Sequence, residues 1–188
     1  MSRAEIIIAG FGGQGILYLG QVLAQAACNV GRKVSWLPSY GPEMRGGTAN
    51  CMVVISDREI YSPMVLTPDV LLTMNKPSLV RFENTVKPTG LVILNKDMID
   101  VQVSRNDINQ LWVQTDTIAK EFGNPKISNM VALGCLVGAT GIIELDEVIN
   151  ALESSFPSNK LELVAENKEA LRRGYTCAGN GGTIYGKY

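Results

Sequence analysis

A glycine-rich turn near the amino terminus is the first candidate for chemistry. Residues 10–15 read GFGGQG, follow the apolar run 5–9 and precede a helical pattern that starts at Ile16. A strand, a glycine turn and a helix in this order form the first unit of an open α/β sheet. Glycine permits positive φ and a close backbone approach, and the free N–H groups of the helix favour an anion or a carbonyl above the turn. The residues of this turn that we expect at a ligand or a partner are Gly10, Gly12, Gly13, Gln14 and Gly15.

The same glycines match the G-x-G-x-x-G pattern of dinucleotide-binding proteins. That pattern also requires an acidic residue at the end of the second strand, where it holds the ribose hydroxyls. We predict the second strand at residues 33–38, and the first acidic residue after the turn is Glu43, inside the next loop. The incomplete pattern disfavours a nicotinamide site, and a stand-alone Rossmann-type nucleotide-binding oxidoreductase module remains the alternative.

A second loop leaves the predicted second strand at the edge where open α/β sheets bind ligands. This loop is richer in functional side chains than a connector needs. Two interpretations are open: a solvated loop with a surface ion pair between Glu43 and Arg45, or a docking loop for another chain. Tyr, Met and Arg are enriched in the cores of protein interfaces. The loop residues that we assign to this interface or ligand edge are Tyr40, Gly41, Pro42, Glu43, Met44, Arg45, Gly46 and Gly47.

Composition restricts the chemistry further. The 188 residues carry a net charge of -1 and include no histidine, which excludes Ser-His-Asp and Cys-His nucleophiles and histidine metal sites. The four cysteines form no C-x-x-C pair, so we expect buried free thiols and no metal in this chain. No basic block indicates nucleic acid, and no segment indicates a signal peptide or a membrane span, so we expect a cytoplasmic protein.

The elements that must position these loops alternate early in the chain and are helical later. This order predicts a single domain over residues 1–188, a three-layer Rossmann-like α/β fold with a mainly parallel sheet and C-terminal helices. We predict strands at residues 5–9, 33–38, 48–56, 69–74, 91–94 and 110–114, with a hairpin partner within residues 58–68. We predict helices at residues 16–29, 77–86, 115–122, 128–140, 145–156 and 161–174, with Thr115 or Asp116 capping the third and Ser128 the fourth.

Both loops together resemble a known family. The run 10–15 and the later run 39–49, which reads SYGPEMRGGTA, resemble the gamma subunit of 2-oxoacid:ferredoxin (acceptor) oxidoreductases, over almost the whole chain. The flanks at residues 38–40 and 48–51 are most similar to the 2-oxoglutarate branch, against pyruvate or branched-chain oxoacids.

The resemblance implies an accessory subunit that is inactive alone. The whole enzyme would oxidatively decarboxylate a 2-oxoacid with coenzyme A to an acyl-CoA and pass electrons to ferredoxin or a similar acceptor. Thiamine diphosphate, magnesium and iron–sulfur clusters would lie in alpha and beta sister subunits, with a delta subunit as an optional addition. A further alternative is that the loops contact coenzyme A, with Arg45 or Lys76 on its phosphates.

Overall fold

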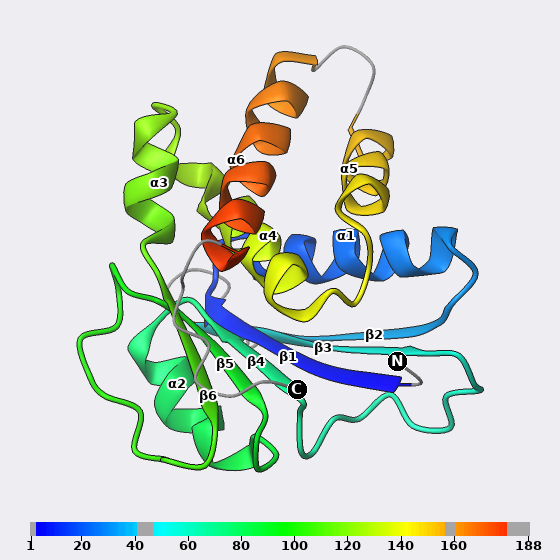
Figure 1. Cartoon of the computed structure of the whole chain (residues 1–188), viewed down its shortest axis with the longest axis vertical. Coiled ribbons are helices and arrows are strands. Elements are labelled where there is room, and N and C mark those ends of the chain that lie inside the picture. The colour runs from blue at the N-terminus through cyan, green and yellow to red at the C-terminus, as the bar shows by residue number, and fades with distance from the viewer. Residues whose placement is uncertain (1–2, 41–46, 157–160, 180–188) are drawn as a thin grey trace.

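A six-stranded sheet forms the centre of the computed structural model, which describes residues 3–40, 47–156 and 161–179. The spatial order is β2-β3-β1-β4-β5-β6 (Figure 1). The strands are β1 (Arg3–Phe11), β2 (Lys33–Tyr40), β3 (Thr48–Ser56), β4 (Val70–Thr73), β5 (Leu91–Asn95) and β6 (Asn109–Val113).

Strand direction confirms a mainly parallel sheet with one exception. The pairs β1–β4, β4–β5 and β5–β6 are parallel, whereas β3 is antiparallel to both of its neighbours, β1 and β2. Residues 41–47 alone connect β2 to β3, and so short a connection can join only antiparallel strands. Because β3 reverses direction, β1 and β2 both end at the same edge of the sheet, which we call the carboxyl edge.

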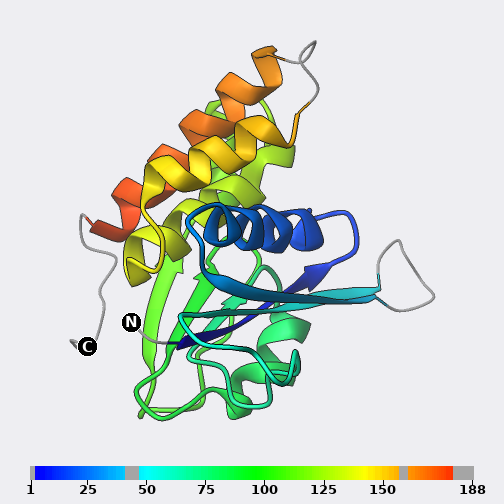
Figure 2. The same ribbon diagram turned by 90° about the vertical axis from the view of Figure 1, so that its right-hand side faces the viewer.

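Helices cover the two faces of the sheet unequally, which gives the predicted three layers (Figures 1 and 2). One face carries α1 (Ile16–Asn29), α3 (Thr115–Glu121), α4 (Ser128–Thr140), α5 (Leu145–Ser154) and α6 (Leu161–Gly179). The other face carries α2 (Lys76–Phe82), followed by the short helix η1 (Glu83–Thr85), and apolar residues from the connections after β3 and β5. A further short helix, η2 (Pro125–Ile127), precedes α4.

The buried helix α4 packs on α6 with almost no space between the two backbones. A Cβ atom on Gly134 would lie 2.0 Å from the carbonyl oxygen of Leu171, and one on Gly174 would lie 2.0 Å from that of Val131. Only glycine at position 134 lets the two helices meet this closely. This contact anchors the C-terminal helix on the core that supports the carboxyl edge.

Several sequence-based predictions of local structure are wrong. Residues 57–69 contain no strand, so the predicted hairpin partner of β3 is absent from this described segment. Neither predicted cap forms, because the residues before α3 and α4 are Gln114 and Ile127 and neither side chain caps its helix. A distant carboxylate, Asp97, accepts hydrogen bonds from Asp116 N at 2.9 Å and Thr117 N at 2.8 Å instead.

The cysteines are all free, but only two are buried. Cys28 is exposed and Cys177 is half-buried, which corrects the expectation of four buried thiols. Cys28 lies in the last turn of α1, on its solvent side, where helical spacing alone could not distinguish the two faces. Burial raises the pKa of Cys51 to about 12, and burial likewise raises the pKa of Cys135.

Candidate functional site

The two loops singled out in the sequence lie together at the carboxyl edge. Gly12 N donates a hydrogen bond to Gly47 O at 2.9 Å, and the strands beneath them pair Gly10 with Ala49. This bond joins residues more than thirty positions apart, directly above the last residues of β1 and the first residues of β3. We call residues 10–15 and 40–47 the edge loops.

The first edge loop uses its glycines for defined structural reasons. Gly13 has φ +97° and Gly15 has φ +72°, both in the region that favours glycine. A Cβ atom on Gly15 would also lie 2.3 Å from Asn129 Nδ2. A Cβ atom on Gly10 would lie 2.7 Å from Gln14 Oε1. Backbone shape and close packing therefore account for Gly10, Gly13 and Gly15 without a nucleotide.

Gln14 closes this turn and fixes it to the neighbouring strand. Its Oε1 accepts a hydrogen bond from Phe11 N at 2.6 Å, and its Nε2 donates to Met74 O at 3.4 Å. The side chain that we placed at a ligand or partner edge is thus occupied by internal bonds. Its role in the described structure is to hold the first edge loop against the end of β4.

The beginning of α1 is open. The N-cap residue, Gly15, has no side chain that could cap the helix, and the first turn of α1 contains no acidic residue. The start of α4 likewise has no side-chain cap and no acidic residue in its first turn. Asn129 Nδ2 donates a hydrogen bond to Gly15 O at 3.3 Å, which holds the starts of α1 and α4 together. Free N–H groups and the helix dipole favour an acceptor oxygen here.

The point between the carboxyl ends of β1 and β4 lies beside the first edge loop, and the chain leaves these neighbouring parallel strands toward opposite faces of the sheet, to α1 and to α2. Such switch points are the usual binding position in open α/β sheets. Asn75 follows β4, and its Oδ1 caps α2 by accepting from Ser78 N at 2.9 Å. Its Nδ2 is buried and has no hydrogen-bond partner among the residues that the structure describes. Lys76, expected to be solvated or to meet a phosphate, forms an ion pair with Asp100 at 3.1 Å.

The second edge loop is described only at its two ends. Tyr40 is the last residue of β2, and Gly47 accepts the bond from the first edge loop. The residues of our prediction that lie outside the described part of the chain are Gly41, Pro42, Glu43, Met44, Arg45 and Gly46. Both interpretations of this loop, a solvated loop with an ion pair between Glu43 and Arg45 or a docking loop, therefore stay predictions.

The nicotinamide alternative gains no support from the described geometry. The end of β2 reads Leu37-Pro38-Ser39-Tyr40 and provides no carboxylate for a ribose. Within residues 3–40, 47–156 and 161–179, no three His, Cys, Asp or Glu side chains gather in a way that could hold a metal ion. In the same ranges, no helix is long and apolar enough to cross a membrane.

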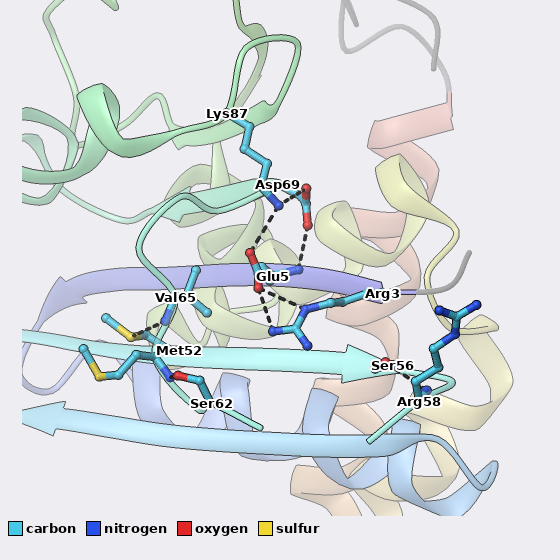
Figure 3. A network of polar contacts seen from close by, with 10 residues as sticks. Arg3, Glu5, Met52, Ser56, Arg58, Ser62, Val65, Asp69 and Lys87 are labelled. Atoms are coloured by element: carbon cyan, nitrogen blue, oxygen red, sulfur yellow. Dashed lines mark hydrogen bonds and ion pairs between the residues drawn. The ribbon is translucent and has the colours of Figure 1, made fainter. Parts of the chain in front are cut away.

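Sequence reasoning missed a charged cluster at the opposite edge, which we call the amino-edge cluster: Arg3, Glu5, Asp69 and Lys87 (Figure 3). Lys87 Nζ lies 2.8 Å from Asp69 Oδ1 and 3.2 Å from Glu5 Oε2, and Arg3 Nη2 lies 2.8 Å from Glu5 Oε1. Burial alone would raise the pKa of Glu5, but hydrogen bonds from Arg3 and Lys87 outweigh it and the pKa is lowered. The members are too far apart in sequence for any spacing pattern to reveal them.

Comparison with known proteins now decides the family. The family described as pyruvate ferredoxin/flavodoxin oxidoreductase matches residues 5–177 of this chain. The chain belongs to this family. The matched range begins at the third residue of β1 and includes the other five strands and both edge loops, so the site lies within the region that defines the family.

Two curated relatives show how this domain occurs elsewhere. Over 174 residues the chain is 44% identical to the ketoisovalerate oxidoreductase subunit VorA of Methanothermobacter marburgensis, covering 92% of this chain but 36% of VorA. It therefore spans about a third of that relative. Over 162 residues it is 38% identical to the 2-oxoglutarate synthase subunit KorC of the same organism, covering 82% of this chain and 87% of KorC.

Solved structures agree with the fold. A keto/oxoacid ferredoxin oxidoreductase gamma subunit from Geobacter sulfurreducens superposes with a TM-score of 0.84 at 26% identity, covering 96% of this chain and 98% of that one. The 2-oxoglutarate:ferredoxin oxidoreductase from Magnetococcus marinus, solved with 2-oxoglutarate, coenzyme A and succinyl-CoA, gives 0.88 at 25% identity, covering 96% of this chain and 32% of that one. The same fold thus occurs as a separate subunit and as part of a longer chain.

Proposed function

We propose that residues 1–188 form one unit that serves as the accessory gamma subunit of a cytoplasmic 2-oxoacid:ferredoxin (or other acceptor) oxidoreductase. The complex would oxidatively decarboxylate a 2-oxoacid with coenzyme A to an acyl-CoA. The observation that carries this proposal is the pair of edge loops joined by the Gly12–Gly47 bond, in a family member whose described residues present no catalytic constellation. A chain of this kind contributes to a larger enzyme by binding and positioning.

The edge loops are the proposed contact with the alpha or beta sister subunits. The amino edge is an unfavourable docking face, because its charges are paired within the chain: Lys87 with Glu5 and Asp69, and Lys33 with Glu59. The carboxyl edge instead presents an open helix start and a loop whose sequence contains Tyr40, Met44 and Arg45. Interfaces concentrate their binding energy in residues of these types.

The cofactors of the proposed complex fit poorly on this chain. Thiamine diphosphate with magnesium needs clustered oxygen ligands, and iron–sulfur clusters need clustered thiolates. Among the described residues, neither Cys51 nor Cys135 gathers with two further His, Cys, Asp or Glu side chains, which does not suit iron ligation. We therefore assign thiamine diphosphate, magnesium and the clusters to sister subunits, which would supply decarboxylation and electron transfer to ferredoxin.

Two classes of 2-oxoacid are candidates for the substrate of the proposed complex. We propose 2-oxoglutarate because the flanks of the second edge loop resemble that branch and KorC is similar to this chain over nearly its full length. The higher identity to VorA, 44% against 38%, favours a branched-chain oxoacid as the second candidate. The native complex, assayed with 2-oxoglutarate, 3-methyl-2-oxobutanoate and pyruvate, will distinguish them by kcat/KM.

Assembly provides the main test. The isolated chain should give no 2-oxoacid-dependent reduction of a viologen dye, whereas the complex purified with its partners should be active. Turnover by the isolated chain would defeat the proposal. Saturable quenching or enhancement of NADH or NADPH fluorescence by the isolated chain would favour the nucleotide-binding alternative instead.

Arg45→Ala tests the docking role of the second edge loop. We expect it to reduce copurification with the sister subunits by about tenfold, because interface arginines often contribute 1.4 kcal/mol or more. The melting temperature of the isolated subunit should stay unchanged. The matched control is Arg58→Ala, because Arg58 follows β3 near the opposite, amino edge of the sheet (Figure 3). An equal loss of thermal stability in Arg45→Ala would contradict docking.

Coenzyme A contact is a separate part of the proposal. The open start of α1 would offer N–H donors to a phosphate, with Arg45 as an added cation. Lys76 is less suited, because Asp100 already neutralises it. In the assembled complex, coenzyme A should protect the amides of residues 12–18 and 39–47 from hydrogen exchange. Unchanged exchange there would remove the contact and leave the docking role standing.

A further inference from the structure

A cavity of about 290 Å³ lies at the amino edge of the sheet. Its apolar wall consists of Ala4, Val70 and Ile142, which belong to the hydrophobic core on the face of the sheet that α4 and α6 cover. Glu5 alternates with Ala4 along β1 and therefore points to the opposite face. The charges of the amino-edge cluster sum to zero and are paired with one another, so the cavity favours apolar side chains over a charged ligand.

The end of α4 fixes one side of this wall. The helix ends at Thr140, and Gly141 follows it with φ +59°. Ile142 N then donates a hydrogen bond to Thr140 Oγ1 at 3.4 Å, and both of these residues line the cavity. The wall is thus preformed, and a preformed wall binds an apolar group with little cost of reorganisation.

The last turn of α6 lies next to the same wall. A Cβ atom on Gly138 would lie 2.7 Å from Tyr175 O and 3.1 Å from the Cβ of Ala178. Thr140, which lines the cavity, comes two residues after Gly138, or about 3 Å along the helix axis. Figure 2 shows the red end of α6 on the same side of the molecule as the end of α4 and the start of β1. The chain therefore leaves α6 within about one helical turn, or about 5 Å, of the cavity wall.

The sequence continues after Gly179 with residues 180–188, which read NGGTIYGKY and lie outside the described part of the chain. Ile184 and Tyr185 carry large and mainly apolar side chains. The two glycines at residues 181–182 permit a sharp reversal of the backbone before them. From Gly179 to Ile184 an extended chain spans up to about 17 Å, which is more than the distance to the cavity requires.

We propose that segment 180–188 folds back from α6 and places Ile184 and Tyr185 in this cavity, against Ala4, Val70 and Ile142. The contact closes the core at the amino edge by joining α6 to the start of β1. A free small molecule is a less suitable occupant, because its binding costs translational and rotational freedom that a tethered segment has mostly lost already. The contact forms within one chain, so its test does not depend on whether the chain is an oxidoreductase subunit.

NMR spectroscopy of the isolated chain with labelled methyl groups tests the contact directly. Nuclear Overhauser effects should connect the methyl groups of Ile184 with those of Val70 and Ile142. A second sample mixes chains labelled at isoleucine with chains labelled at valine, so that it reports only contacts between two copies. The proposal is overturned if Ile184 shows no contact with Val70 or Ile142, or if the contact with Val70 is equally strong in the mixed sample.

Variants of the segment test its contribution to stability. Removal of residues 180–188 should lower the melting temperature of the isolated chain by about 4–8 °C, because two large side chains lose a buried position. The double variant Ile184→Asp with Tyr185→Asp should reproduce this loss in the full chain. Its matched control, Asn180→Asp with Thr183→Asp, adds the same two negative charges beside the proposed contact and should be neutral. An equal loss in the control would show that charge alone acts and would overturn the proposal.

A double-mutant cycle assigns the stability to this cavity. If Ile184 packs on Ile142, the variant that carries both Ile142→Ala and Ile184→Ala should lose about 2 °C less than the sum of the two single losses. The control cycle pairs Ile142→Ala with Leu163→Ala, in the first turn of α6, and should be additive because Leu163 is exposed and does not line the cavity. Additive losses in the first cycle would place Ile184 elsewhere and overturn the proposal.

Discussion

Substitution of Gly13 tests whether the glycine turn is specified by backbone shape. The structure gives Gly13 φ +97°, and apart from its two chain neighbours no atom of the described residues lies within 4 Å of a Cβ built on it. We therefore expect the cost of a side chain at this position to be conformational, because the described neighbours make no contact with it. This separates Gly13 from Gly10 and Gly15, where a side chain would collide with other atoms.

The magnitude follows from this geometry. Placing an ordinary L-residue at positive φ costs about 1–2 kcal/mol. The lower entropy of the unfolded chain offsets about 0.4–1 kcal/mol of that. Gly13→Ala should therefore lose about 1 kcal/mol, and Gly13→Val about 2 kcal/mol, because a β-branched residue resists positive φ most strongly. For a chain of this size the melting temperature should fall by about 3 °C and 6 °C.

Thermal and urea unfolding of the isolated subunit, followed by circular dichroism, will measure these losses. Gly13→Asn should lose less than Gly13→Ala, because Asn is enriched at positive φ. Gly179→Ala, in α6 and also with open space around its Cβ, has no positive φ and should be neutral or slightly stabilising. A Gly13→Val protein as stable as the parent would refute the reasoning.

The remaining predictions concern positions that hold the fold together. Gly174→Ala should cost about 3 kcal/mol in urea unfolding, because its Cβ would overlap the backbone of α4; a loss below that of Gly13→Ala would show that the helices separate freely. Asp97→Ala should cost about 1 kcal/mol, since it removes the distant cap of α3, and a neutral Asp97→Ala would contradict capping. The pKa of Glu5 is below its ordinary 4.5, so its ionisation stabilises the fold above that pH and the stability is lost as pH falls through the folded pKa. Glu5→Gln should therefore flatten the acid limb of a stability–pH curve, and an unchanged limb would count against the amino-edge cluster.

Much of the architecture could be predicted because it depends on local patterns. The apolar runs predicted all six strands to within a few residues, and α1 and α4 begin and end where the sequence indicated. Tertiary pairing extended β1 beyond its predicted range of residues 5–9, because neighbouring β3 offers nine paired positions. The wrong cap at α3 has the same origin, since Asp97 lies in a different connection and no local rule could find it.

The candidate site was predicted in outline only. The predicted strands placed both edge loops at one edge, because each loop follows the carboxyl end of a strand in an open α/β sheet, and the Gly12–Gly47 bond confirms that the two loops meet. Of the two internal bonds of Gln14, the one to Met74 O could not be predicted because Met74 is sixty residues away, and the one to Phe11 N depends on the shape of the glycine turn. The assignment of Gly41 to Gly46 to the interface stays a prediction.

The sequence by itself determined the chain's family, the order of its strands and helices and the absence of histidine chemistry, because each depends on residue type and near-neighbour spacing. Only the tertiary structure decided that β3 runs against its neighbours and that the edge loops bond to each other. Only the tertiary structure brought Arg3, Glu5, Asp69 and Lys87 together beside a cavity. Such groupings arise from strand pairing between distant segments, which is fixed by packing of the whole core and leaves no periodic trace in the chain.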